Sequence, residues 1–592
     1  MQHRLLALAL ASAGLLSACG GGSDGSGETP APPPSGGTPT PVTLVGVVAK
    51  GAALGGAAVT ATCATGGGSA TTDAAGAYSL SLGTSGALPC VLSAASSDGT
   101  THLHSVATTS TANITPLTEL LVAQLTGEDP ATFAAGATGS ALSSTITTSA
   151  VAAAQNVVVS TLTSAGVDTS AITDFVTGTL VAASGSTSGN SYDQALEALN
   201  TQLTTAGTTL SELTTTVATT SAAASGSSSS GSSGNSSLLP PELLLATKAS
   251  NCSTLATGNY RVIELAPSVT TGDTDPVTAT AVLHIDAATL TVNNAATPND
   301  TWTWTAAGNC HYTAPDGSDI VVAPSGVIVA RAYVDTDDDS VNTSARGSFR
   351  MVIGLPEQQH TPSELEGSWN GLFAWMNAGH YSSSAISVSI DANGAVTHVL
   401  CANDEETGTP TASCTTSTTD LPVFSANAEG GFDLASTSTS DVWKDRVFAF
   451  RSGSGDLMLL DISPDGSWFV MSRGRTLSLP ALNSTSANWS LLTDTTGVGL
   501  ALSGSTHVVT AVDASTGTYT RDTTDQASSS VTTQTLAINA PRDGYTHRLA
   551  SSGVRESWFM GLKGMGLTGL YLVNSSTSGT SNARFGLSVQ QP

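Results

Sequence analysis

The stretch that decides the fold is residues 466–471 (GSWFVM), in which a serine and an aromatic residue open a short run of mostly apolar side chains. Two similar stretches occur in the second half of the chain, at 347–352 (GSFRMV) and 556–561 (ESWFMG). Runs rich in aromatic and β-branched residues are typical of β-strands. We interpret the three stretches as the closing strands of three copies of one β unit, because repetition at a long period indicates duplicated structure.

Each copy also has an opening strand with an aromatic residue near its start. The three openers are 259–263 (NYRVI), 368–373 (SWNGLF) and 488–492 (NWSLL). The predicted hairpins that follow them are 281–292, 385–400 and 507–521. We therefore expect an antiparallel β domain at 238–592, built from units 250–358, 363–480 and 484–592. The pattern leaves open whether these units form separate sheets, small barrels or the blades of a ring.

The chain before this domain changes in character. Residues 221–237 contain mainly serine, glycine and alanine, the composition of a flexible linker. Upstream, Thr115 and Pro116 suit the cap and first turn of a helix. Apolar residues at helical spacing then define three helices, containing Leu117, Leu120, Leu121 and Leu125; Val151, Ala154, Val158 and Leu162; and Tyr192, Leu196, Leu199 and Leu203. This predicts an alanine- and threonine-rich helical bundle over 113–220.

Residues 43–112 have the alternation of short antiparallel strands, at Val45 and Val47 and again at Tyr78, Leu80 and Leu82. The turn 72–78 (TDAAGAY) and the glycine-rich segment 46–59 resemble the carboxypeptidase regulatory-like module, a small transthyretin-like β-sandwich. That resemblance implies a structural or ligand-binding accessory module. The order of this module and the alanine-rich helices is similar to that of uncharacterised exported bacterial lipoproteins, a family without an assigned activity.

The N-terminus has the features of a lipoprotein signal. A basic start at His3 and Arg4 precedes an apolar run, and small residues precede Cys19. This resembles the lipobox of bacterial lipoproteins, which implies a signal peptide at 1–18 and lipidation of the Cys19 thiol. Residues 19–42 are rich in glycine, proline and serine and are predicted to form a disordered tether. We expect a lipid-anchored protein of the cell envelope, on the periplasmic or surface face of the outer membrane.

Cysteine usage supports export independently. Apart from Cys19, six of the seven cysteines remain, and they fall two by two into separate segments. Three local disulfides are predicted, Cys63–Cys90, Cys252–Cys310 and Cys401–Cys414, as expected in an oxidising compartment. No Cys-x-x-Cys spacing is present, which argues against a zinc or thioredoxin-type site.

The charge balance excludes one large class of partners. Lys and Arg number 18 against 45 Asp and Glu, which gives a net charge of −27. Such a chain repels the phosphate backbone, so we expect no nucleic-acid partner. The expected partners are the membrane, through the lipid, and an unknown protein or glycan ligand.

Few residues suggest chemistry. Asp335, Asp337 and Asp339 alternate in a loop as calcium ligands do, although Ser340 and Arg346 depart from the EF-hand pattern. We expect no cofactor, because a solvated acidic hairpin tip explains these carboxylates more simply, and calcium is the one alternative. His102 and His104 stand two apart in a predicted strand, where exposed polar residues are the simpler explanation than a metal pair.

Two further patterns have plain structural explanations. Residues 564–569 (GMGLTG) match G-x-G-x-x-G but lie in β-like sequence, which argues against a dinucleotide site. Tryptophans could stack on a sugar or peptide, yet Trp369, Trp468, Trp489 and Trp558 recur at similar places in the repeat, which favours a core role.

The sequence predicts a mainly β, multidomain protein with a small N-terminal sandwich, a helical spacer and a C-terminal β domain. We expect a binding or structural role without catalysis. Two alternatives remain open: an exported hydrolase of glycan or ester substrates with its site in the C-terminal domain, and a calcium-dependent binding module.

Overall fold

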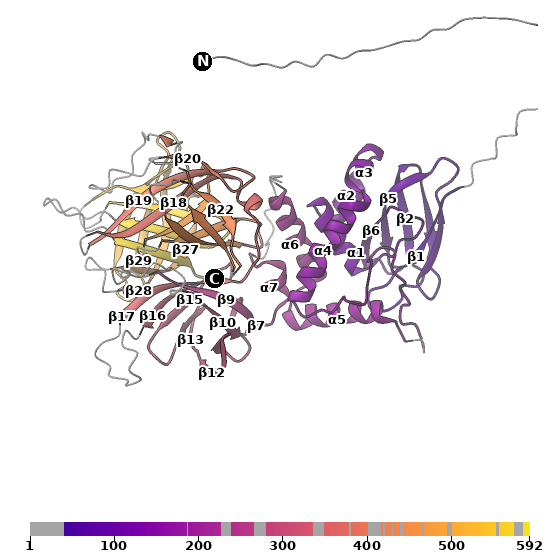
Figure 1. Ribbon diagram of the computed structural model, residues 1–592, viewed down its shortest axis with the longest axis horizontal. Helices are drawn as coiled ribbons and strands as arrows, with labels where there is room; N and C mark the ends of the chain where they lie inside the picture. Colours follow the sequence, from indigo (N-terminus) through magenta and orange to yellow (C-terminus); the bar gives the residue numbers. More distant parts are fainter. Residues whose placement is uncertain are drawn as a thin grey trace, which may run out of the picture. The chain divides into compact units, whose positions relative to one another are not determined.

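The protein is mainly β, as a computed structural model shows (Figure 1). The structure describes residues 41–185, 188–225, 238–265, 280–334, 348–377, 380–400, 416–417, 421–428, 430–437, 443–463, 467–493, 500–540, 542–551, 556–572 and 584–592. All of these lie in one compact part of the chain, Pro41–Pro592. None of the helices in the described ranges has both the length and the apolar character needed to cross a bilayer.

The N-terminal β part consists of two sheets around a shared apolar core. The smaller sheet pairs β1 (Thr43–Val47) with β4 (Ala77–Ser81). The larger has the order β3-β2-β5-β6, and its strands are β2 (Ala58–Thr65), β3 (Gly67–Thr71), β5 (Ala87–Ala95) and β6 (His102–Ala107). Within β1, Leu44 is buried and Val45 is 42% exposed. The core side of β1 is the face that carries Leu44, because side chains alternate along a strand.

The helices follow the sandwich and share its core. They are α1 (Pro116–Thr126), α2 (Pro130–Gly136), α3 (Gly139–Thr145), α4 (Thr148–Ser164), α5 (Ser191–Ala206), α6 (Leu210–Ala224) and α7 (Pro241–Leu245). Thr115 caps α1 through its side chain, which accepts a hydrogen bond from the Thr118 amide. The apolar stripes of α1, α4 and α5 are buried as their spacing predicts.

Helix α6 extends four residues into the segment predicted to be a linker. Ser221 supports this extension, because its hydroxyl donates to the backbone carbonyl oxygen of Gln124 over 2.6 Å and accepts from the Gln124 side-chain amide over 3.2 Å. Ala222 beside it is buried. Small side chains, which suit a flexible linker, also allow close packing of α6 against α1.

The first unit of the C-terminal region is a single antiparallel sheet of nine strands. Its order is β12-β11-β10-β9-β17-β16-β15-β14-β13. The strands are β9 (Gly258–Leu265), β10 (Thr280–Asp286), β11 (Thr291–Asn294), β12 (Thr297–Thr303), β13 (Thr305–Gly308), β14 (His311–Thr313), β15 (Asp319–Val322), β16 (Ile328–Val334) and β17 (Ser348–Pro356). The first strand, β9, pairs with the last, β17. The two edge strands, β12 and β13, are separated in the chain by Trp304 alone, which brings the two edges of the sheet close together. A short hairpin of β7 (Lys248–Ala249) and β8 (Cys252–Ala256) precedes it.

The second unit repeats this topology. Its order is β21-β20-β19-β18-β26-β25-β24-β23-β22. The strands are β18 (Gly367–Asn377), β19 (His380–Ile390), β20 (Val396–Leu400), β21 (Thr416–Ser417), β22 (Val423–Ala426), β23 (Phe432–Ala435), β24 (Lys444–Arg451), β25 (Leu457–Ile462) and β26 (Trp468–Arg473). The first strand, β18, again pairs with the last, β26. Bridging between Ala395 and Val423 links the start of β20 to the edge strand β22.

The third unit is a closed barrel of eight strands, here called the third barrel. Its strands are β27 (Thr485–Thr493), β28 (Leu500–Asp513), β29 (Thr518–Asp525), β30 (Val531–Ile538), β31 (Tyr545–Arg548), β32 (Ser557–Leu562), β33 (Leu567–Leu572) and β34 (Arg584–Gln590). The closing strand is β34, which pairs with β27. The predicted closing stretch 556–561 is therefore wrong in this unit, where it forms β32, while the corresponding stretches form the closing strands β17 and β26.

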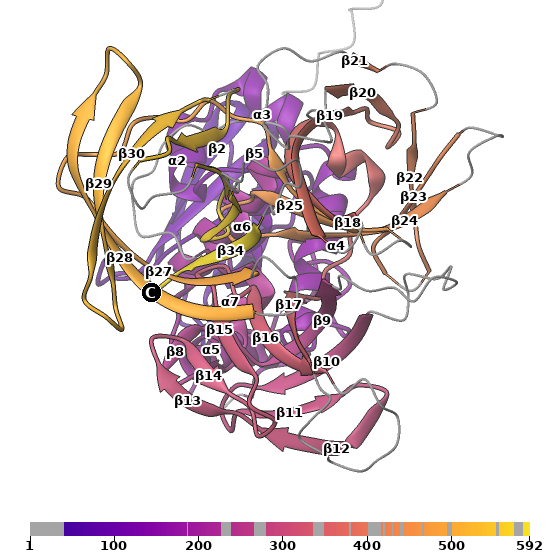
Figure 2. The same cartoon turned by 90° about the vertical axis from the view of Figure 1, so that its left-hand side faces the viewer.

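One apolar core joins the three units, and Figure 2 shows their strands side by side around it. It takes alternate residues from strands of every unit, such as Ile353, Val470 and Leu587. Met565, in the turn between β32 and β33, is fully buried in this core. The hydroxyl of Ser325 in the first unit donates to the Met565 carbonyl oxygen over 2.8 Å. Lys563 in the same turn forms a 2.7 Å ion pair with Asp456 of the second unit.

Candidate functional site

The interiors of the three units differ in chemistry. The first unit is filled by an apolar cluster that includes Tyr260, Trp304 and Tyr312, and the second by one that includes Trp369 and Phe432. The strands of the third barrel contribute Leu491, Leu587 and similar residues to the core shared with the other units. Their alternate residues face the interior of the barrel. Among the described residues, that interior holds no comparable apolar cluster.

Two arginines from non-adjacent strands meet inside the third barrel. Arg521 is on β29 and Arg548 is on β31, and the guanidinium carbon of each lies 5.5 Å from the centre of the Phe559 ring on β32. Strands β30 and β31 separate β29 from β32 in the barrel order. Arg521 can reach Phe559 only across the interior, so all three side chains point inward.

Polar side chains hold this basic pair in place. The Nε and Nη2 groups of Arg521 donate to the side-chain oxygen (Oε1) of Gln534 over 3.2 and 3.1 Å. Arg548 donates to the hydroxyl of Ser557. Within the part of the chain that the structure describes, no carboxylate pairs with Arg521. The interior therefore contains a guanidinium group that is hydrogen-bonded but not neutralised by a local charge.

The electrostatics of the interior follow from this pair. Burial and the charge of Arg521 together lower the pKa of Arg548 to about 10, so Arg548 stays charged at neutral pH. Burial also lowers the pKa of Arg521. Burial and the two arginines lower the pKa of His507 on β28 to about 3. His507 is thus neutral, with hydrogen bonds to the hydroxyls of Thr523 over 2.9 Å and Ser505 over 3.2 Å. The barrel interior is a positive environment in a protein of net charge −27.

The side chains that face this interior are not fully buried. Arg521, Arg548, His507 and Phe559 are each only partly buried, although all four face the inside of a closed barrel. Serine and threonine hydroxyls line the same surface, and Ser490 and Ser588 hydrogen-bond to each other over 2.7 Å. Accessible space beside a fixed positive charge suits the binding of an anion.

A second polar cluster lies where α7 meets the second unit, in a pocket of about 540 Å³. The Gln358 amide donates to Glu242 over 3.2 Å and to the Arg451 carbonyl oxygen over 2.9 Å. His360 contacts Gln358 through one ring nitrogen and Glu364 through the other, at 3.0 and 2.9 Å. We call these five residues the junction network.

The junction network has the appearance of an acid–base site but is internally saturated. Burial raises the pKa of Glu242. Burial would also raise that of Glu364, but His360 and Arg451 lower the pKa of Glu364 to about 2. Both Glu364 oxygens already accept hydrogen bonds, one from His360 and Arg451 and the other from the Thr361 amide. The network holds α7 against the second unit, and it leaves neither Glu364 oxygen for a substrate.

A buried acid pair lies inside the second unit. Asp461 on β25 is on the same strand face as Leu457 and Leu459, which belong to the interior cluster. It is 3% exposed, and within the described chain its Oδ1 atom has no hydrogen-bond partner. Burial and the nearby charge of Asp445 raise the pKa of Asp461. Among the described residues, no group of three His, Cys, Asp or Glu side chains is placed to bind a metal ion.

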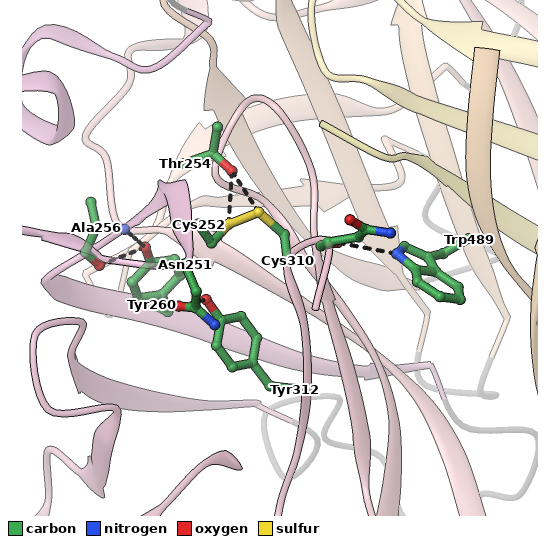
Figure 3. Close-up of a disulfide and its surroundings, with 9 residues drawn as sticks. Asn251, Cys252, Thr254, Ala256, Tyr260, Cys310, Tyr312 and Trp489 are labelled. Atoms are coloured by element: carbon green, nitrogen blue, oxygen red, sulfur yellow. Dashed lines mark hydrogen bonds between the residues drawn. A yellow bond between two sulfur atoms is a disulfide. The ribbon is translucent and has the colours of Figure 1, made fainter. Parts of the chain in front are cut away.

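The predicted disulfides can be followed for two of the three pairs. Cys63–Cys90 joins β2 to β5, and Cys252–Cys310 joins β8 to the turn after β13. Figure 3 shows the hydroxyl of Thr254 beside both sulfurs of the second bond, 3.3 and 3.9 Å away. Cys401 and Cys414 lie outside the described residues.

The lipidation and calcium predictions also lie outside the described residues. Cys19 precedes residue 41, where the described part of the chain begins. Asp335, Asp337 and Asp339 fall between the described residues 334 and 348. Both remain predictions.

His104 corrects the expectation of exposed strand histidines. It is 6% exposed, and its Nδ1 lies 3.0 Å from the Glu119 carboxylate of α1. His102 is exposed at the start of β6, so the two rings have different environments. Both line a second pocket, of about 550 Å³, between the sandwich and the helices.

The glycine-rich motif and the tryptophans are structural, as expected. Gly564 and Gly566 have positive φ values of 69° and 66° in the β32–β33 turn. A side chain at Gly566 would lie 2.4 Å from Pro324 of the first unit, so close packing requires glycine there. Trp369, Trp468 and Trp558 are buried. Trp489 is partly buried and donates from its indole nitrogen to the Asn309 carbonyl oxygen over 3.2 Å (Figure 3).

Sequence reasoning did not find Arg521, Arg548 or His507. The signal was the inward position of basic residues on strands that otherwise carry serine and threonine. Recognising it requires the strand register, because a shift of one residue moves each side chain to the outside.

Comparisons with known proteins give only distant likenesses. No protein-family model matches the chain, and no curated protein matches it. One similar structure is a protein of unknown function of the DUF3598 family from Nostoc punctiforme, at 11% identity, covering 40% of this chain and 100% of that one, with a TM-score of 0.18. Transferrin binding protein B from Neisseria meningitidis is 11% identical over 53% of this chain and 66% of that one, with a TM-score of 0.17. A double mutant of the same protein from Haemophilus parasuis is 9% identical over 57% and 76%, with a TM-score of 0.19.

Proposed function

We propose that this protein is a lipid-anchored protein of the outer membrane that binds a small ligand inside its third barrel and catalyses no reaction. The observation that carries the binding role is the contrast between interiors. The interiors of two units are filled mainly by apolar side chains, with one buried acid pair in the second, whereas the third barrel keeps polar, partly exposed side chains around Arg521 and Arg548. Charged groups are rarely kept inside a protein without a functional reason.

Export is supported by the two disulfides within the described chain. Cys63–Cys90 and Cys252–Cys310 each close a loop inside one segment, and such bonds persist in oxidising compartments outside the cytoplasm. Together with the signal-like start, they favour attachment through a lipid on Cys19. In this proposal residues 43–112 are a regulatory-like accessory module, and the helices separate the β region from the membrane.

The anchoring part of the proposal predicts the behaviour of a Cys19→Ser variant. Without the thiol no lipid can be attached, so the variant should appear in the soluble exported fraction or as an uncleaved precursor. Membrane fractionation and metabolic labelling with a radioactive fatty acid measure this. A Cys63→Ser variant, which keeps Cys19, is the control and should remain labelled. A mature Cys19→Ser protein that still sediments with membranes would contradict the anchor.

The binding part predicts that filling the barrel interior abolishes ligand binding. Ser588→Trp places a large side chain where Ser490 and Ser588 now meet, so ligands that raise the melting temperature of the wild type should no longer do so. Thr533→Trp, on the exposed outer face of β30, is the matched control and should respond like the wild type. Thermal unfolding with a panel of neutral and charged small molecules measures this. Equal ligand responses of the wild type and Ser588→Trp would place the ligand elsewhere.

The two alternatives have less support. A hydrolase needs a free acid–base pair, and the Glu364 carboxylate of the junction network is engaged by its own neighbours. A calcium-dependent module depends on Asp335, Asp337 and Asp339, and it stays a prediction from the sequence.

A further inference from the structure

We propose that the ligand of the third barrel is an organic anion, whose acidic group binds Arg521 and Arg548 and whose apolar body lies against Phe559 and its neighbours. This rests on the proposed function, that the barrel interior binds a small ligand. It adds the chemical class of that ligand and the residues that recognise it.

The first argument is the convergence of two guanidinium groups on one ring. Arg521 and Arg548 come from strands that do not pair with each other, and both lie 5.5 Å from the centre of Phe559. Two like charges repel, and the repulsion is stronger where water is partly excluded. A carboxylate, sulfonate or phosphate placed against both would relieve this repulsion and accept several charge-assisted hydrogen bonds.

The second argument is the donor inventory. Arg521 uses its Nε and Nη2 groups for the side-chain oxygen of Gln534, and no carboxylate within the described chain pairs with it. Its Nη1 group is therefore available to an acceptor from outside the protein. His507 is neutral and lies between two hydroxyls, so it adds a polar contact without a third positive charge.

The third argument is the apolar surface beside the arginines, which favours an organic ligand over an inorganic ion. Tyr519 is two residues before Arg521 on the same face of β29, and it is paired in register with Leu536 of β30. Leu536 is in turn paired with Arg548. An aromatic ring and an aliphatic side chain thus adjoin the basic pair, and Phe559 lies against both guanidinium groups. Contact with this surface stabilises a ligand with an apolar body in proportion to the area buried.

The experiment compares three probes on the full exported chain carrying Cys19→Ser, which needs no detergent. Octanoate and 1-octanol have the same apolar body and differ in charge, and inorganic phosphate has the charge alone. Isothermal titration should show octanoate binding at least tenfold more tightly than either of the others. Raising the ionic strength should weaken octanoate binding and leave 1-octanol unchanged.

The variants locate the site. Arg521→Gln and Arg548→Gln should each weaken octanoate binding about tenfold or more, the effect of losing one charge-assisted contact. Two variants are used so that a folding failure of one leaves the other informative. Arg331→Gln is the control, because Arg331 also lies over a phenylalanine ring, Phe349, but in the first unit. It should bind octanoate like the parent.

The outcomes distinguish a failure of this inference alone from a failure of the proposed function. If 1-octanol binds as tightly as octanoate, and Ser588→Trp abolishes both, the barrel binds a ligand but not through its charge, and the inference is wrong. If phosphate binds as tightly as octanoate, the organic class is wrong. If no probe binds the parent chain, the inference fails together with the binding role. Unchanged octanoate affinity in both arginine variants would overturn the assignment of the residues.

Discussion

Replacing Met565 by alanine should lower the free energy of unfolding by about 2–5 kcal/mol, the range for truncating a fully buried methionine. The side chain is 0% exposed and sits in the core that all three units share. Its loss leaves a cavity at the point where the turn of the third barrel meets the first and second units. The β region should also become more sensitive to protease, because the contacts of one unit with the others support all three.

Urea unfolding of the full chain, followed by tryptophan fluorescence, measures this effect. Val531→Ala is the control, since Val531 is 62% exposed on the third barrel, and its truncation should change stability by about 0.5 kcal/mol or less. A loss for Met565→Ala as small as that of the control would show that the turn does not pack as described.

Replacing Asp461 by asparagine should stabilise the protein at neutral pH by about 1–3 kcal/mol, the usual penalty for burying a poorly compensated polar group. Burial and the charge of Asp445 raise the pKa of Asp461 in the folded state. In the unfolded state the carboxyl titrates near its ordinary pKa of about 3.9. The contribution of the protonated carboxyl to stability is therefore complete below that pH and is lost as the pH rises towards the folded-state pKa.

The pH dependence provides the decisive comparison for Asp461. Asparagine cannot ionise, so the advantage of Asp461→Asn should be small at pH 4 and reach its full value above the folded-state pKa. Urea unfolding at a series of pH values measures it. Asp513→Asn is the control, because hydrogen bonds from Ser515 lower the pKa of the exposed Asp513, and this change should not stabilise the protein at neutral pH. If the difference in unfolding free energy between Asp461→Asn and the wild type stayed constant across the pH series, it would contradict the raised pKa of Asp461.

The parts of the fold that sequence could predict are those set by local patterns. The helix at Thr115 and Pro116 has its cap, its first turn and its apolar stripe within one short segment. The pairs Cys63–Cys90 and Cys252–Cys310 each lie within one predicted domain, so proximity in the chain was a sufficient guide. The mainly β class and the threefold repeat follow from strand-like runs that recur.

The parts that sequence could not predict depend on which strands pair. The stretch at 556–561 looks like the closing strands of the other units, but hydrogen bonding to β27 is made by β34. Local strand propensity is the same for both, so only the closed barrel distinguishes them. The same limit applied to Leu44 and Val45, both of which are apolar, because the choice of buried face depends on the opposite sheet.

The candidate site was hidden for the same reason. Arg521 is three strands away from Phe559 in the pairing order and meets it only when the barrel closes, whereas Arg548 is on the neighbouring strand, β31. Each of these residues, taken alone, is of a type that is common on exposed strands. The site forms only when three strands bring these side chains together, and no motif or spacing in the sequence indicates it.

The closure of each unit by its first and last strands also sets the order in which the chain can fold. Strands β9, β18 and β27 gain their second hydrogen-bonded neighbour in the sheet only when β17, β26 and β34 are present. During synthesis the N-terminal part of the chain emerges first. The first unit and then the second can therefore fold before all strands of the third have been made. The turn that carries Met565 then inserts between two finished neighbours. The third barrel is therefore completed by β34, the last of its strands in chain order.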